Sequence, residues 1–448
     1  MGVIRCGYFM KVYFASLGCD KNLVDSEHML ADISKEHKIV DDPAECDLAI
    51  VNTCAFINDA KEESINTILK LAEYKESNLK YLMVTGCLAQ RYYDDLKELI
   101  PEIDAYVGIS AVGNILDDIN KLSKKKTLVD MPDINAAQNA SGDRFFTPPY
   151  HYSYLKIAEG CDKNCSYCSI PKIRGSFRSV PMEELVKEAE FLAANCVSEL
   201  ILVAQETTVY GKDLYGKKSL VELVNKLTEI EGIRWVRLMY CYPEEIDDEL
   251  IELINNNPKV VHYLDIPIQH SSDRILQKMG RRTSKKDIED LIKRLRRNIP
   301  DISLRTSLIV GFPGETDEEF DELCAFVKKA KFDRLGVFTY SREEGTLAYS
   351  FKPQIKAQVK KLRRDTLMKI QKDISLKRNK SFVKKELKAV IEGYDTSENV
   401  YVARLYCDAP DVDGCVFIES DKELLSGSFV KVKITGYSEY DLIGEIIS

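Results

Sequence analysis

The sequence predicts an α/β protein of three parts: an N-terminal parallel α/β domain, an open parallel barrel of six βα units and a small C-terminal β-barrel. Short apolar runs alternate with amphipathic ones from about residue 10 to 120, and again from 151 to about 339. This alternation is typical of parallel strands covered by helices. From residue 384 to 448 the runs are short and strand-like, with Gly, Asp and Ser between them, which is typical of a small barrel of the oligonucleotide-binding type.

In the N-terminal domain, predicted at residues 10–120, three apolar runs each end on a cysteine. The runs are KVYFASLGC, DLAIVNTC and YLMVTGC, which end at Cys19, Cys54 and Cys87. The ends of parallel strands share one edge of a sheet, where ligands bind, so we expect these thiols to converge. A lone Cys is more often a buried core residue. Three at equivalent positions instead predict the ligands of an iron–sulfur cluster, with one iron left open.

The central domain is predicted at residues 151–350, after a polar, aperiodic segment at 121–150 that is interpreted as a linker. Its six strand-like runs are YSYLKIAE, ELILVAQ, WVRLMY, HYLDIPI, SLRTSLIV and RLGVFT. In parallel barrels the chemistry lies at the C-terminal ends of the strands. The polar groups that follow these strands are therefore the candidates for a site.

The stretch CDKNCSYC follows the first of these strands and places Cys161, Cys165 and Cys168 within eight residues, in a chain that has 13 Cys in 448. Zinc is the alternative ligand, but a closed zinc site needs four Cys or His. The nearest histidine, His151, is ten residues before Cys161. Three thiolates can hold three irons of a four-iron cluster and leave the fourth open to a substrate.

Other polar residues follow later strands of the same domain. Gln205 and Glu206 follow the second strand, Gln269 and His270 the fourth, and the turn GFPGET the fifth. The Gly-Pro-Gly turn allows the backbone to approach a ligand closely. Each group is also compatible with an ordinary loop, and His270 is given no role. No catalytic residue is assigned beyond the cluster ligands.

A basic segment, predicted as a helix at residues 351–383, precedes the C-terminal barrel. Between residues 352 and 385 it has 13 basic residues and two acidic ones, and Ile355, Val359, Leu362 and Ile370 are predicted to form its buried stripe. The favoured interpretation is a helix packed on the barrel with a solvated lysine face. Contact with RNA is the alternative.

Charge and cysteine content restrict the partners and the compartment. The chain has a net charge of −9, and residues 386–448 carry 13 acidic and five basic side chains. This acidic balance argues against nucleic acid as the main partner of the C-terminal barrel. The cysteines have no regular disulfide spacing, and there is neither a secretory leader nor a membrane-spanning apolar run. We expect a cytoplasmic protein without a membrane partner.

The motif CxxxCxxC, with Tyr167 before the last Cys, resembles the signature of radical S-adenosylmethionine enzymes. The resemblance implies that Cys161, Cys165 and Cys168 bind a 4Fe-4S cluster whose open iron is chelated by S-adenosylmethionine. It also implies that Gly311, Gly314 and Glu315 lie beside this cofactor, as does Tyr167. In such enzymes the cofactor supplies the radical, and the protein supplies position and electrostatics.

The order of the parts resembles the methylthiotransferases, whose C-terminal module is a TRAM domain. The segments SLGCDKNLVDSE, CAFINDAKEESI, QETTVYG, DIPIQHSS, GFPGET and FTYSREEGT are most similar to the branch that methylthiolates an aspartate β-carbon of ribosomal protein S-twelve. One departure is Glu206, where that branch leads us to expect Asp. The resemblance implies a second 4Fe-4S cluster at Cys19, Cys54 and Cys87.

The same resemblance implies a double use of S-adenosylmethionine, as methyl donor and as radical source. It also implies a low-potential electron donor such as flavodoxin or ferredoxin. The expected substrate is ribosomal protein S-twelve, free or in the ribosome, and tRNA is the less favoured partner. Two alternatives stay open: the sister tRNA adenosine methylthiotransferase, and a non-catalytic, metal-stabilised RNA-binding protein.

Overall fold

The computed structural model describes residues 9–122, 124, 127–136 and 142–447. Cys6, Ser448 and parts of the predicted linker, at 123, 125–126 and 137–141, lie outside the described residues. The chain divides into two compact units. Unit 1 consists of Met1–Pro148, Tyr154–Asp162 and Cys168–Phe191, and unit 2 of Pro149–Ser153, Lys163–Tyr167 and Leu192–Ser448.

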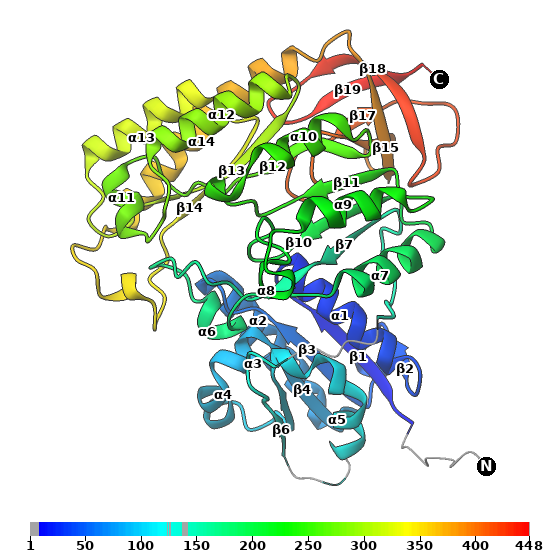
Figure 1. The fold of residues 1–448 in the computed structure, drawn as a ribbon. Helices are drawn as coiled ribbons and strands as arrows, with labels where there is room; N and C mark the ends of the chain where they lie inside the picture. The colour runs from blue at the N-terminus through cyan, green and yellow to red at the C-terminus, as the bar shows by residue number, and fades with distance from the viewer. Residues whose placement is uncertain (1–8, 123, 125–126, 137–141, 448) are drawn as a thin grey trace. The chain divides into compact units, whose positions relative to one another are not determined.

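The sheet of unit 1 has six parallel strands in the order β2-β1-β3-β4-β5-β6 (Figure 1). The predicted parallel α/β domain is therefore confirmed. Three short strands, β2, β5 and β6, were not among the predicted runs, and β6 lies inside the segment interpreted as a linker, where it pairs with β5. They are too short to give a periodic pattern. The strands are β1 (Lys11–Ser16), β2 (Lys38–Val40), β3 (Leu48–Thr53), β4 (Tyr81–Gly86), β5 (Ala105–Val107) and β6 (Leu128–Asp130).

Helices cover both faces of this sheet. Along β3, Leu48 and Ile50 belong to one core, and Ala49 and Val51 to the other, as expected for side chains that alternate along a strand. The first core also contains α1 (Asp20–Ile33) and α5 (Ile115–Leu122), and the second contains α2 (Asn58–Ala72), α3 (Cys87–Arg91) and α4 (Tyr93–Leu99). Unit 1 also contains α6 (Ile170–Arg174) and the pair β8 (Ala158–Glu159) and β9 (Arg178–Ser179).

The second large sheet has the strand order β14-β13-β12-β11-β10-β7. Successive strands are neighbours, and the pairs from β10 to β14 are parallel, as predicted for six βα units. The strands are β7 (Tyr152–Lys156), β10 (Glu199–Val203), β11 (Trp235–Leu238), β12 (Val260–Asp265), β13 (Ser303–Val310) and β14 (Arg334–Thr339). The intervening helices are α7 (Met182–Ala194), α8 (Lys212–Tyr215), α9 (Leu220–Glu229), α10 (Asp248–Asn256), α11 (Asp273–Lys278), α12 (Lys285–Asn298) and α13 (Asp317–Ala330).

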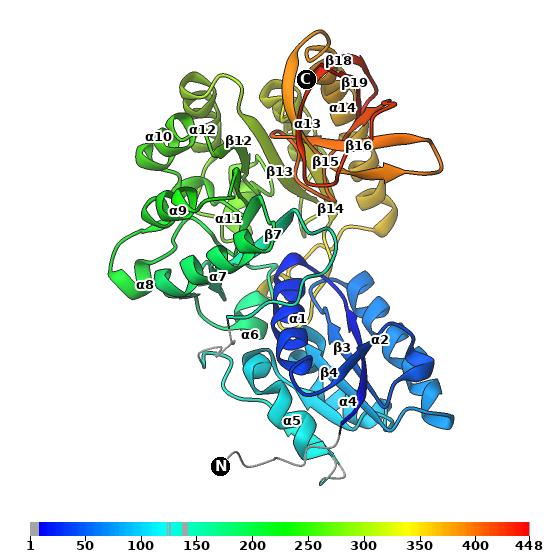
Figure 2. The ribbon, with the colours of Figure 1, turned by 90° about the vertical axis from the view of Figure 1, so that its right-hand side faces the viewer.

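The C-terminal segment forms a closed five-stranded barrel, β15-β16-β17-β19-β18, drawn in orange and red in Figure 2. This confirms the predicted small β-barrel. Its core is apolar and includes Ile391, Leu405 and Ile434. The strands are β15 (Glu386–Asp395), β16 (Val400–Leu405), β17 (Val416–Ile418), β18 (Phe429–Tyr437) and β19 (Leu442–Ile446).

The basic segment forms helix α14 (Ala357–Lys380), but the predicted buried stripe is wrong. Leu362 is 67% exposed, and the buried row is Arg363, Leu367, Gln371, Ser375 and Asn379. Hydrogen bonds explain the difference. Gln371 Nε2 donates to Phe332 O at 2.9 Å, and Asn379 Nδ2 donates to Ser438 O at 3.2 Å. The helix is therefore attached through polar groups, which an apolar pattern does not report.

Buried ion pairs join the C-terminal barrel to the N-terminal ends of the β10 and β14 strands within unit 2. Arg404, on β16, lies 2.6 Å from Glu199, the first residue of β10, and 2.9 Å from Glu392 on β15. Asp408, which follows β16, pairs with Arg334, the first residue of β14. Apart from Glu392, which is partly exposed, these charges are nearly inaccessible to solvent. The barrel is therefore attached opposite the strand ends where the chemistry is predicted.

We expect the substitution Arg404→Met to lower the free energy of unfolding by about 3 kcal/mol, because it leaves the buried Glu199 with one of its two arginines, Arg237. Chemical denaturation of the full chain would measure it. Arg364→Met is the control, since Arg364 is an exposed arginine paired with Asp365, and its effect should stay within about 0.5 kcal/mol. Equal effects of the two substitutions would contradict a stabilising role for the buried pairs.

Candidate functional site

Three thiols follow three adjacent strands of unit 1. Cys19, Cys54 and Cys87 come directly after β1, β3 and β4, which are neighbours in the sheet. The backbone before Cys19 passes close to Cys54, since a Cβ at Gly18 (φ +93°) would lie 2.7 Å from Cys54 Cβ. The pKa of Cys87 is raised to about 12, chiefly by burial; Arg174 opposes the shift, and Cys19 and Cys54 add to it. The structure thus brings these three predicted residues together.

The donor set of this site consists of three thiols, the residue type that binds iron–sulfur clusters. Among the described residues, no three His, Cys, Asp or Glu side chains lie where they could hold one metal ion. In a four-iron cluster each thiolate binds a different iron, so the sulfur atoms stand farther apart than around one ion. Cys54 and Cys87 are buried and Cys19 is exposed. Three thiols at one sheet edge suit such a cluster chemically.

A buried arginine lies beside this thiol site. Arg174, at the end of α6, is 1% exposed and donates to Asn22 Oδ1 and, at 2.7 Å, to Glu159 Oε2. It also lies 3.3 Å from Asp25. Its guanidinium acts on Cys87 both through its charge and as a hydrogen-bond donor. One cation is thus held between α1, the Cys87 thiol and the residues before Cys161.

A second cation completes this buried network in unit 1. Lys156 pairs with Asp25 and, at 3.0 Å, with Glu159. Burial alone would raise the pKa of Glu159, but Arg174 and Lys156 lower it well below its ordinary value. Glu159 therefore carries its charge in the folded protein. The charges of Lys156 and Arg174 are thus balanced by those of Asp25 and Glu159, next to the CxxxCxxC loop.

The CxxxCxxC loop connects β8 to α6, and the division between the two units passes through it. In unit 1, Cys161 N donates to Gly175 O at 3.2 Å, and Ile170 N donates to Cys168 Sγ at 3.5 Å. The residues just before and after the loop are thus joined by a backbone hydrogen bond, and also by the pair Glu159–Arg174. This clamp fixes both ends of the loop.

In unit 2, Cys165 lies among aromatic and cationic side chains. Its Sγ is 3.9 Å from the hydroxyl of Tyr242, and the Arg281 guanidinium lies 4.3 Å from the centre of the Tyr242 ring. Next in the chain, Ser166 N donates to Met279 O at 2.9 Å. Tyr167 packs against an apolar cluster that includes Phe312. These contacts fix the second half of the loop.

Glu206 lies beside the same loop within unit 2. Its carboxylate is 1% exposed and 3.4 Å from the ammonium group of Lys163, between Cys161 and Cys165 in the chain. Lys163 is also 2.7 Å from Glu245. Burial raises the pKa of Glu206 to about 7, although Lys163 opposes this shift. The residue that departs from the family pattern is thus a partner of a lysine in the cysteine loop.

The GFPGET turn follows β13, and its glutamate stabilises the turn itself. Glu315 is 3% exposed and accepts hydrogen bonds from Gly311 N and, at 3.0 Å, from Phe312 N. Its other oxygen lies 3.3 Å from Arg363. Gly311 has φ +72°, and a Cβ there would collide with the Lys360 side chain. Contact of Gly311, Gly314 or Glu315 with S-adenosylmethionine stays a prediction.

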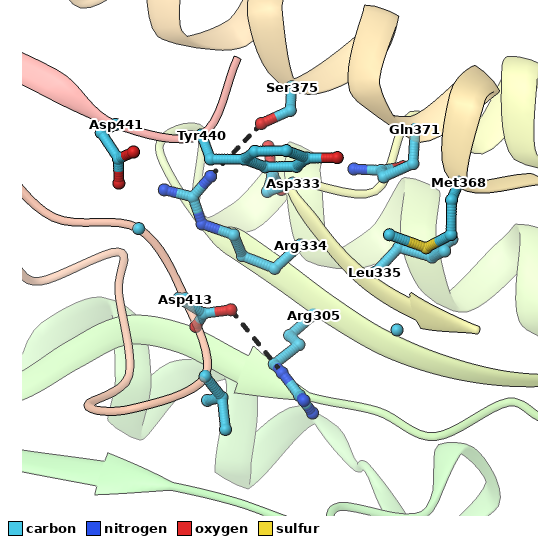
Figure 3. Close-up of a pocket in the computed structure, with 13 residues that line it drawn as sticks. Arg305, Asp333, Arg334, Leu335, Met368, Gln371, Ser375, Asp413, Tyr440 and Asp441 are labelled. Carbon is cyan, nitrogen blue, oxygen red and sulfur yellow. Dashed lines mark hydrogen bonds and ion pairs between the residues drawn. The ribbon is translucent and has the colours of Figure 1, made fainter. Parts of the chain in front are cut away.

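A pocket of about 220 Å³ lies at the other end of β13 and β14, beside α14 and the C-terminal barrel (Figure 3). Its charged groups are already paired. Arg305 lies 3.7 Å from Asp413 and 2.7 Å from Asp265, and Arg334 pairs with Asp408. It contains no cysteine. It belongs to the attachment of the C-terminal barrel rather than to the thiol sites.

The sequence analysis missed Arg174, Lys163 and Glu159 as residues of the site. Arg174 had a signal, because a basic residue follows the apolar pair Ile170 and Ile173 only six positions after Cys168. Its partner Asn22 is 152 residues away in the chain, and no local pattern gives that contact. His270, which was given no role, is fully buried and accepts a hydrogen bond from Ser272 N at 2.9 Å.

Family models match all three parts of the chain. The radical SAM superfamily matches residues 155–327, the uncharacterized protein family UPF0004 matches 11–108, and the TRAM domain matches 383–447. The fold and the cysteine loop thus define a radical S-adenosylmethionine protein with an N-terminal α/β domain and a C-terminal TRAM barrel. Curated relatives then define the family more closely.

The chain belongs to the RimO family, whose members are named ribosomal protein uS12 methylthiotransferases. It is 54% identical to the protein of that name from Lachnoclostridium phytofermentans, over 97% of this chain and 99% of the relative. It is 53% identical to that from Acetivibrio thermocellus, over 98% of each chain.

One solved structure with a similar fold is the radical S-adenosylmethionine methyltransferase TsrM from Kitasatospora setae. The match has a TM-score of 0.53 at 14% identity and covers 73% of this chain and 72% of that one. At this identity the likeness concerns the fold alone. In the part of the chain that the structure describes, no helix is long and apolar enough to cross a membrane.

Proposed function

We propose that this protein is a methylthiotransferase that places a methylthio group on the β-carbon of an aspartate in ribosomal protein uS12, by radical S-adenosylmethionine chemistry. The observation that carries the proposal is the near full-length identity to proteins of that name, in a chain that keeps two sets of three cysteines. Three thiols leave one iron of a four-iron cluster open. The reaction needs an open iron at two places.

The two cysteine sets would hold separate clusters. Cys161, Cys165 and Cys168 would hold the cluster that binds S-adenosylmethionine, and Cys19, Cys54 and Cys87 the other. When bound, the groups supply a radical at the first site and carry sulfur at the second. Tyr167, Gly311, Gly314 and Glu315 are proposed as cofactor contacts.

The residues around the cysteine loop would position it. Glu159 and Arg174 join the two ends of the loop, and Lys163 is paired with Glu206 and Glu245. An unactivated C–H bond is not replaced by proton transfer alone, so the task of these residues is to orient the groups and exclude water. Their burial keeps the charge pairs strong.

The proposed partners of the protein follow from its proposed substrate and from the charge of its C-terminal barrel. The acidic C-terminal barrel is proposed to face a basic ribosomal protein, and a low-potential donor such as flavodoxin or ferredoxin would supply electrons. A cytoplasmic location goes with such a substrate. One feature favours the sister activity on tRNA: α14 exposes several lysines, among them Lys361, Lys369 and Lys377.

Mass spectrometry of ribosomal proteins and tRNA from a deletion strain would test the proposal. We expect uS12 from that strain to lack the mass of one methylthio group on an aspartate, and the full-length gene to restore it. The tRNA modification should remain unchanged. Loss of a methylthio group from tRNA with intact uS12 would favour the sister activity instead.

A further inference from the structure

Arg174 connects the two cysteine sets within unit 1. It lies at the end of α6, just after the CxxxCxxC loop, and yet its guanidinium donates to Asn22 Oδ1 of α1, which lies 3.9 Å from Cys87 Sγ. Glu159, its partner at 2.7 Å, precedes the same loop. A residue encoded beside one predicted cluster therefore lies against a ligand of the other.

The positive charge of Arg174 is buried and held in place by its neighbours. The side chain is 1% exposed, and its pKa is raised well above the ordinary value because Cys87, Glu159 and Asp25 outweigh the cost of burial. A guanidinium keeps its charge under all biological conditions. It therefore acts as a fixed positive charge beside Cys87, whose thiolate would be a ligand of the N-terminal cluster.

A fixed cation next to a cluster ligand stabilises the reduced state of the cluster, which carries one more negative charge than the oxidised state. Hydrogen bonds to the sulfur atoms and the net charge around a cluster set its reduction potential. Removal of the cation should therefore shift the midpoint potential to more negative values. Glu159 bonds Nη1 of Arg174, whereas Nη2 bonds Asn22 Oδ1, the atom that lies 3.9 Å from Cys87 Sγ. Of these two opposite charges, the arginine is therefore the one on the side of the thiol.

We propose that Arg174 is a positioning residue for the N-terminal cluster: it raises the cluster's potential and ties this cluster to the loop of the other one. The inference rests on the proposed function, since it requires a cluster at Cys19, Cys54 and Cys87. It adds a residue that matters to that site without binding iron.

The competing explanation is purely structural, since Arg174→Gln alone would leave Lys156 to compensate both Glu159 and Asp25. A paired variant separates the two explanations. Arg174→Gln with Glu159→Gln removes one charge of each sign and leaves Lys156 to compensate Asp25. If the role is only structural, this double variant should behave like the parent chain once it has folded.

The experiment uses the full chain carrying Cys161→Ala, Cys165→Ala and Cys168→Ala, reconstituted with iron and sulfide, so that only the N-terminal cluster contributes. The readouts are the midpoint potential, from a redox titration followed by electron paramagnetic resonance, and the rate of iron loss to a chelator. Arg174→Lys is included because it keeps the charge but loses the planar fork.

A matched control lies in the same unit. Arg144 is as buried as Arg174 and is held by Glu27 and, at 2.6 Å, by Glu188, and no cysteine is among the residues that shift its pKa. The variant Arg144→Gln with Glu27→Gln therefore removes an equivalent pair away from the thiols. It should leave the midpoint potential unchanged.

We expect the Arg174/Glu159 double variant to fold, to have a more negative midpoint potential and to lose iron about 10- to 100-fold faster, with Arg174→Lys in between. An unchanged potential and rate in the double variant would overturn the inference. So would an equal shift in the Arg144/Glu27 control. Absence of iron from the parent chain would instead overturn the proposed function, so the two failures are distinguishable.

Discussion

Replacement of Cys161, Cys165 and Cys168 by alanine in one chain is expected to abolish the cleavage of S-adenosylmethionine to 5′-deoxyadenosine. It should also reduce bound iron from about eight to about four atoms per chain, because each set of three thiols holds one four-iron cluster. Without these ligands no open iron remains to chelate the cofactor. Iron and acid-labile sulfide analysis of anaerobically reconstituted protein, with chromatography of the nucleoside product, would measure both effects.

Three other cysteines provide the control for this experiment. Cys196, Cys324 and Cys415 lie outside both sets; Cys196 is exposed and Cys415 partly so. Their replacement by alanine should leave about eight irons and normal cleavage. Full iron in the first triple variant would show that the assignment of these ligands is wrong, and it would also remove the proposed place of the cofactor.

The second large effect concerns the other cysteine set. The chain with Cys19→Ala, Cys54→Ala and Cys87→Ala should retain about four irons and still cleave S-adenosylmethionine, but it should transfer no methylthio group to uS12. The reason is that the CxxxCxxC loop is clamped by Glu159 and Arg174, neither of which is replaced. Mass spectrometry of uS12 after incubation, beside the cleavage assay, would measure the separation.

Folding must be checked before this result is interpreted, because Cys54 and Cys87 are buried at the edge of the sheet. Circular dichroism and the denaturation midpoint of the variant should remain near those of the parent. If a folded variant could no longer cleave the cofactor, the two sites would not have separate roles. Retained transfer to uS12 would show that sulfur is carried elsewhere.

The elements that could be predicted from the sequence are those with local periodicity. Both parallel sheets and the closed C-terminal barrel follow from apolar runs such as LAIVNT at β3 and SLRTSLIV at β13. The convergence of Cys19, Cys54 and Cys87 follows from one rule about strand ends. The domain boundaries and the ligands stay predictions, because no bound group tests them.

The remainder depends on contacts between distant residues. The buried row of α14 consists mostly of polar side chains, so an apolar stripe through Leu362 gave the wrong face. The pair Arg174–Asn22 spans 152 residues, and the pair Lys163–Glu206 depends on the meeting of two loops. A buried charge is placed by its partner, and no local pattern names that partner.

The ion pairs of the C-terminal barrel affect whether it can fold separately from the rest of the chain. Arg404 and Asp408 lie on one side of the contact, and Glu199 and Arg334 on the other, all of them buried. Separation of the two parts at residue 384 would break the pair Arg334–Asp408, and it would leave Arg404 with Glu392 alone and Glu199 with Arg237 alone. The TRAM segment is a separate module in the sequence, but we expect it to unfold together with the strands to which these pairs attach it. An exchange of this domain between relatives would have to carry both halves of each pair.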